Sequence, residues 1–217
     1  MTLITKGEII ISFDLLNKSN LNYILLRNID NELPDNLQVG KDIDVLVNKK
    51  DESKFNHFFI KNGYVKIEHP FRNDTFLYGV DKFEFHYNND NNILFDLNFQ
   101  IAVRSLDAGQ WIPLDQEIQE SVWRNKRFEQ RDDNFGYWTM SYEDELLTLI
   151  TRSVFDKKQF QKGYINRINQ LLSLVKFNEI SFKLEKVFFK SAPFILTKIK
   201  NQEFETIVKD YLEFKDY

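Results

Sequence analysis

The spacing of apolar and polar positions divides the chain into a first half of short strands and helices and a second half that is mainly helical. Apolar residues at helical spacing predict a first helix over 6–18 and a second over 52–62, with Asp51 as its N-cap. Apolar and alternating runs predict strands at 23–26, 42–47, 64–67, 75–80, 83–87 and 93–101.

From about residue 110 the spacing of apolar residues becomes helical. Ser141-Tyr142-Glu143-Asp144 resembles a capping box before a helix, and Pro193 is expected to separate two of the later helices. These later helices are predicted near 162–175, 179–190 and 203–214. The element order indicates an α/β (α+β) fold: a mixed β-sheet with flanking helices over residues 1–108, followed by a mainly helical region over 109–217 that packs on it.

Composition narrows the function classes. Hydrophobic residues make up 42% and charged residues 29% of the 217 positions, which is typical of a soluble globular protein. The net charge of −4 offers no basic field for nucleic acid, so we expect no nucleic-acid partner. The absence of cysteine excludes disulfides, thiolate catalysis and cysteine-bound zinc. No apolar run is long enough to span a bilayer, so we expect no membrane insertion and a cytoplasmic location.

Two acidic residues interrupt the apolar strand that follows Gly40 and Lys41. Asp42 and Asp44 are two positions apart, so in a strand their side chains point to the same face. Adjacent carboxylates repel each other and resist burial, and a divalent cation between them removes both costs. The alternative is that one aspartate caps the strand and the other faces water.

A third carboxylate lies in the middle of a later strand. From Phe95 to Ile101 large apolar residues alternate with Asp96, Asn98 and Gln100, so the polar residues share one face. Three aspartates from two adjacent strands can hold Mg²⁺ (or Mn²⁺) and orient a nucleoside triphosphate. Asp96 is then best placed to help deprotonate an attacking group.

The stretch from Gly40 to Val47, together with Phe95-Asp96-Leu97-Asn98-Phe99, resembles the nucleotidyltransferase fold of the DNA polymerase β superfamily. It is most similar to the uncharacterised bacterial nucleotidyltransferases of polysaccharide and natural-product gene clusters. The resemblance implies Mg²⁺-dependent transfer of a nucleotidyl group from an NTP to a hydroxyl or phosphate of a small-molecule or glycan acceptor, with a role in surface-polysaccharide biosynthesis. It implies catalysis and metal binding by Asp42, Asp44 and Asp96, and nucleotide binding by Arg27, Asn28, Gly40 and Lys41.

Two other functions stay open beside this one: transfer of a phospho-alcohol onto a glycan, as in the LicD-like branch, and non-catalytic binding of a nucleotide or partner. The last is open because Arg27-Asn28 stands where the family has Gly-Gly or Gly-Ser. Glycine lets the backbone approach the triphosphate. Arg27 either donates to a phosphate instead or blocks the nucleotide.

Weaker candidates lie in the second half of the chain. Three basic residues after the helix that bears Glu143–Ile150 either hold an anionic acceptor or are solvated, and several aromatic residues either stack on a base or sugar or pack in the core. The basic residues are Arg152, Lys157 and Lys158, and the aromatic residues are Trp111, Trp123, Tyr137 and Trp138.

Overall fold

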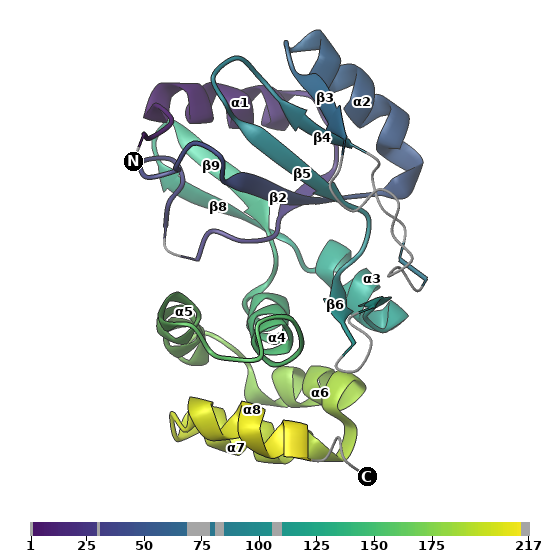
Figure 1. Cartoon of the computed structure of the whole chain (residues 1–217), viewed down its shortest axis with the longest axis vertical. Helices are drawn as coiled ribbons and strands as arrows, with labels where there is room; N and C mark the ends of the chain where they lie inside the picture. Colours follow the sequence, from purple (N-terminus) through teal and green to yellow (C-terminus); the bar gives the residue numbers. More distant parts are fainter. Residues whose placement is uncertain (1, 30, 69–78, 81–84, 106–109, 214–217) are drawn as a thin grey trace.

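A computed structural model describes residues 2–29, 31–68, 79–80, 85–105 and 110–213 (Figure 1). The strand expected at 75–80 falls largely outside these residues. No helix in the described part of the chain is both long and apolar enough to cross a membrane.

A seven-stranded mixed sheet forms the centre of the molecule, with the strand order β3-β4-β5-β2-β1-β9-β8. The pairs β2–β5 and β1–β9 are parallel, and the other neighbours are antiparallel. The strands are β1 (Tyr23–Leu25), β2 (Asp42–Val47), β3 (Val65–Glu68), β4 (Phe85–Asn88), β5 (Leu94–Asn98), β8 (Arg127–Asp132) and β9 (Phe135–Thr139). A separate two-stranded sheet pairs β6 (Ala102–Arg104) with β7 (Trp111–Pro113).

Two helices cover one side of the large sheet, and the later helices stack on the other side (Figure 1). The first two are α1 (Lys6–Lys18) and α2 (Glu52–Lys61). The later ones are α3 (Gln116–Arg124), α4 (Tyr142–Thr151), α5 (Lys162–Leu172), α6 (Phe177–Phe188), α7 (Ala192–Lys200) and α8 (Phe204–Glu213). Short helical turns η1 (Lys49–Asp51), η2 (Arg152–Asp156) and η3 (Phe189–Ser191) connect them. The expected class, a mixed sheet with flanking helices followed by helices, is confirmed.

The alternation of side chains along the central strands produces two hydrophobic cores. Tyr23 and Leu25 of β1 join the core beneath α1 and α2, whereas Ile24 between them joins the core formed with the later helices. Leu46 of β2 likewise faces the later helices. The central strands are therefore buried on both faces.

Several details differ from the sequence prediction. The helical spacing expected from residue 110 is wrong for 127–139, where β8 and β9 form a hairpin at the edge of the large sheet. The predicted strand 93–101 ends at Asn98, and β6 begins only at Ala102. Pro193 stands between the helices expected near 179–190 and 203–214, but it lies in the first turn of α7, a helix that was not predicted, where its missing N–H is tolerated.

Asp51 occupies the predicted N-cap position of α2, but its side chain does not cap the helix. It accepts no capping hydrogen bond, because the turn η1 precedes α2 and Asn48 caps that turn. The Asp51 carboxylate instead bonds to Nζ of Lys54 at 2.6 Å. The division at residue 108 stays a prediction, and the large sheet has strands on both sides of it.

Candidate active site

Three aspartates converge where β2 and β5 run parallel. The register pairs Asp44 with Asp96 and places Asp42 beside Leu94. Since directly paired residues and residues two apart share a face, all three side chains project from the same face. One carboxylate oxygen from each of Asp42, Asp44 and Asp96 lies within 4.8 Å of the others. These three residues are hereafter called the aspartate trio.

The two strands hold the trio through their apolar residues. Val45, Leu46 and Val47 of β2 are fully buried, and Phe95 and Leu97 flank Asp96 in the core. Asp42, at the beginning of β2, is exposed, whereas Asp44 and Asp96 are half-buried. The trio therefore runs from the solvent into the sheet.

Arg27 contributes a positive charge to the trio. It lies two residues after the end of β1, and the N–H of Leu26 donates to the carbonyl oxygen of Asp44 at 3.0 Å. The Arg27 guanidinium donates to the Asp44 carboxylate, and the two side chains are only 19% and 15% exposed. The structure thus brings Arg27 directly to the trio.

Burial and charge act in opposite directions on this ion pair. Burial raises the pKa of Asp44, as do the charges of Asp42 and Asp96, while Arg27 opposes the rise. Burial works to lower the pKa of Arg27, but the negative charge and hydrogen bond of Asp44 outweigh it and hold that pKa above its usual value. Arg27 consequently remains a cation.

Asn28 organises a loop next to the trio. Its side-chain oxygen accepts from the N–H of Leu33 at 3.0 Å, and its amide donates to the hydroxyl of Tyr137 at 3.0 Å. These bonds connect the loop after β1 to β9. The predicted nucleotide contact of Asn28 stays a prediction, and the structure gives its side chain a structural role.

Gly40 and Lys41 lie at the other end of the loop between β1 and β2, directly before Asp42. Gly40 has φ +89°, a conformation that glycine adopts more readily than any other residue, so it allows the turn into β2. Lys41 is paired with Glu32 and is half exposed. Their part in nucleotide binding stays a prediction.

Two hollows that share part of their lining open around the trio. The first, of about 210 Å³, is bordered by the whole trio, by Asn98 of β5, by Gln100 between β5 and β6, and by Trp111 of β7. The second, of about 540 Å³, lies on the side of Lys41 and Lys157. The residues common to both are Arg27, Asp42, Asp44 and Arg152.

Arg152 and Lys157 reach this position through an irregular turn. The chain after α4 forms the π-helical turn η2, in which the N–H of Lys157 donates to the carbonyl oxygen of Arg152 at 2.9 Å. Arg152 also pairs with Asp156 at 3.2 Å. As far as the described residues define the hollows, Lys158 borders neither of them.

Three further residues that border the two hollows were not predicted from the sequence. Gln161 and Tyr164 at the beginning of α5 border the second hollow, and Thr148 of α4 borders the first. Only the fold brings these positions to the trio. Of the four aromatic candidates, Trp111 borders the first hollow, Trp123 packs against one core, and Trp138 meets Phe128 edge to face. The fourth, Tyr137, is buried in the other core.

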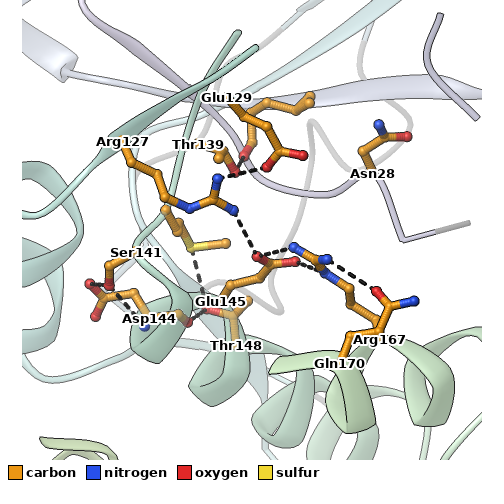
Figure 2. A network of polar contacts seen from close by, with 12 residues as sticks. Asn28, Arg127, Glu129, Thr139, Ser141, Asp144, Glu145, Thr148, Arg167 and Gln170 are labelled. Atoms are coloured by element: carbon orange, nitrogen blue, oxygen red, sulfur yellow. Dashed lines mark hydrogen bonds and ion pairs between the residues drawn. The ribbon is translucent and has the colours of Figure 1, made fainter. Parts of the chain in front are cut away.

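A polar network beside the site holds α4 and α5 against the edge of the sheet (Figure 2). Glu145 of α4 accepts from Nε and Nη2 of Arg167 at 2.6 and 2.8 Å, and Arg127 of β8 joins Glu145 to Glu129. Burial acts to raise the pKa of Glu129, but the hydrogen bonds that Arg131 and Arg127 donate to it, with their charges, outweigh burial and hold that pKa below its usual value. Because these charges are paired with one another, the network serves to position α4.

No known protein family matches the sequence, and no curated protein does. Among solved structures, the lincosamide antibiotic adenylyltransferase LnuA bound to lincomycin covers 80% of this chain over 100% of its own, with 12% identity and a TM-score of 0.46. ANT(2'')-Ia in complex with adenylyl-2''-tobramycin covers 87% of this chain over 97% of its own, with 13% identity and a TM-score of 0.47. The solution structure of the antibiotic-resistance factor ANT(2'')-Ia gives 12% identity and a TM-score of 0.45. At these values, the assignment of function depends on the geometry of the site.

Proposed function

We propose that the protein is a Mg²⁺- or Mn²⁺-dependent nucleotidyltransferase that moves a nucleotidyl group from an NTP to an acceptor hydroxyl. The observation that carries this proposal is the convergence of the aspartate trio, with its ligand atoms within 4.8 Å of one another, in a cleft that also contains basic residues.

The trio has the donor chemistry that such a metal needs. Mg²⁺ and Mn²⁺ prefer hard oxygen ligands, and the trio offers three carboxylates on one face of the sheet. Asp42, Asp44 and Asp96 would hold the cation. When bound, the cation supplies neutralisation of phosphate charge and polarisation of the phosphoryl oxygens.

The basic residues of the second hollow suit the triphosphate. Arg27, Lys41, Arg152 and Lys157 border this hollow beside Asp42 and Asp44. Their positive charges would orient the β- and γ-phosphates and offset the charge that develops on the departing pyrophosphate.

The first hollow suits the acceptor. Asn98 and Gln100 provide donors and acceptors of hydrogen bonds for hydroxyl groups, and Trp111 provides an aromatic face for a sugar-like ring. The acceptor hydroxyl oxygen would form a bond to the α-phosphorus while the bond from that phosphorus to the pyrophosphate oxygen breaks. Asp96 would take the hydroxyl proton, and pyrophosphate leaves. A hydroxylated small molecule or a glycan, as in surface-polysaccharide assembly, fits this chemistry.

Binding of the four NTPs, each with and without Mg²⁺, tests the metal and the nucleotide together. We expect at least one NTP to raise the melting temperature only when Mg²⁺ is present, because a ligand that binds the folded state stabilises it. Asp96→Asn should retain the fold by circular dichroism and release no pyrophosphate when an acceptor panel is supplied. Arg131→Gln, outside the cleft, is the matched control and should behave as the native protein.

The outcomes separate the candidate functions. Pyrophosphate release that depends on an acceptor supports nucleotidyl transfer. NTP binding without turnover favours the non-catalytic binder. An Mg²⁺-dependent transfer of a phospho-alcohol with no NTP turnover favours the LicD-like reaction. If no NTP binds with Mg²⁺, the proposal is wrong.

A further inference from the structure

The Arg27 guanidinium contacts a carboxylate of the candidate metal site, that of Asp44. It donates to Oδ2 of Asp44, and the Asp44 side chain is only 15% exposed. Asp44 is also one of the three residues whose oxygens lie within 4.8 Å of one another. The Asp44 carboxylate is therefore paired with the Arg27 guanidinium and is also one of the three candidate metal ligands.

The backbone keeps Arg27 close to this carboxylate. Leu26 donates its N–H to the carbonyl oxygen of Asp44 at 3.0 Å, so the residue before Arg27 is tied to Asp44 itself. The register of β1 and β2, which pairs Leu25 with Val45, continues to this point. This backbone bond does not involve the Arg27 side chain, which is held by its own contact with the Asp44 carboxylate.

The Arg27 side chain also lines the second hollow. Arg27 borders the second hollow together with Lys41, Arg152 and Lys157, where the phosphates are proposed to bind. Three carboxylates close together repel one another in the metal-free protein, and a guanidinium at Asp44 offsets part of that repulsion.

We propose that Arg27 is a resident counter-cation that competes with the divalent cation for Asp44 and that metal binding releases its guanidinium toward the phosphate side of the cleft. This inference rests on the proposed function, since it assumes that the trio binds a divalent cation. Arg27 is then a positioning residue that couples metal binding to nucleotide binding. A static ion pair, by contrast, would keep Arg27 on Asp44 in both states.

Chemical labelling of the native protein tests the release without any substitution. Phenylglyoxal reacts with accessible guanidinium groups, and peptide mapping reports the rate at each arginine. With Mg²⁺ present and no nucleotide, we expect the labelling rate of Arg27 to rise severalfold. Arg131 is the internal control, because it too is bound to a carboxylate, that of Glu129 at 2.8 Å, but lies away from the trio. An unchanged or slower rate at Arg27 would overturn the proposal.

Metal affinity of two variants supplies the second test. Mn²⁺ binding is measured by calorimetry or electron paramagnetic resonance in the absence of nucleotide. Arg27→Gln removes the competitor, so we expect it to bind Mn²⁺ about tenfold more tightly than the native protein. Arg152→Gln is the control: Arg152 borders the same two hollows, but its guanidinium is paired with Asp156. We expect the Mn²⁺ affinity of this variant to rise about twofold at most.

The two proposals fail in different ways. If neither the native protein nor any variant binds Mn²⁺, the proposed function itself fails. If Mn²⁺ binds but Arg27→Gln binds it no more tightly than Arg152→Gln does, only the competition by Arg27 is excluded. If Arg27→Gln does not fold, Arg27→Lys replaces it, because lysine keeps the positive charge without the planar guanidinium. A single ammonium binds Asp44 less firmly, so we expect Arg27→Lys to bind Mn²⁺ more tightly than the native protein.

Discussion

Asp42 and Asp44 have different surroundings although they lie two residues apart on one strand. Asp42 is exposed at the beginning of β2, where water solvates its charge. Asp44 is largely buried and accepts from the Arg27 guanidinium. Both would serve as metal ligands, but in the metal-free protein Asp44 alone of the two holds a buried cation within the described structure.

This difference predicts that substitutions of the two aspartates have different effects on the free energy of unfolding. Asp44→Asn should lower the free energy of unfolding of the metal-free protein by about 1–3 kcal/mol, because it leaves Arg27 without its charged partner. Asp42→Asn should leave that free energy unchanged or raise it slightly, since it removes a like charge from the trio. Urea unfolding in EDTA measures both variants. Equal destabilisation by the two substitutions would contradict the assigned roles.

The convergence of the trio was predictable from the sequence, because the alternation places Asp42 and Asp44 on one face of a strand and Asp96 on the polar face of another. Their role as metal ligands stays a prediction. The partners of Arg27 and Asn28 were not predictable. Arg27 meets Asp44 through the antiparallel register of β1 and β2, and Asn28 meets Tyr137, which is 109 residues away. No local pattern encodes such distances, so the choice between phosphate contact and blockage stayed open at Arg27.

The β8–β9 hairpin shows how an edge strand escapes detection by hydrophobic pattern. β8 carries one large apolar residue, Phe128, and that side chain is 43% exposed. Its charged residues instead pair with one another and with α4 (Figure 2). Strand β9 is largely buried but short, with Gly136 in its interior. The alternation that identifies a strand is therefore weak on both sides of the turn.

Gly136 tests the packing of this hairpin. A Cβ at this position would lie 2.6 Å from Cε1 of Phe128 and 3.0 Å from the carbonyl oxygen of Glu129, so Gly136→Ala forces the ring and the partner strand apart. We expect a loss of about 1–3 kcal/mol in the free energy of unfolding.

Gly7→Ala is the matched control, because an added Cβ there meets none of the described atoms within 4 Å and the residue lies in the first turn of α1. It should stabilise the protein by up to about 1 kcal/mol. Thermal and urea unfolding of both variants compare the two glycines. A neutral Gly136→Ala would show that Phe128 does not pack over the glycine.

The two hydrophobic cores share the central strands of the molecule. Alternate residues of β1 enter opposite cores, and β9 returns to the sheet after α3 has begun the helical side. A buried polar cluster ties three helices of that side together: the fully buried Asp144 of α4 accepts from Ser121 of α3 at 3.1 Å and pairs with Lys183 of α6. Neither core can be exposed without disturbing strands that also support the other.

We therefore expect the chain to unfold in one cooperative transition, although the sequence predicts two regions that divide at residue 108. Two double variants, each with a single tryptophan, report on the sheet and on the helices separately by fluorescence. Trp111→Phe/Trp123→Phe retains Trp138 on β9, and Trp111→Phe/Trp138→Phe retains Trp123 on α3. In urea, the fluorescence midpoint of each variant should coincide with its own midpoint by far-ultraviolet circular dichroism, as a two-state transition requires. If the Trp123 signal changes at a clearly lower urea concentration than the Trp138 signal, the helical side unfolds separately. Arg152 and Lys157 would then belong to a unit that can leave the trio while the sheet remains folded.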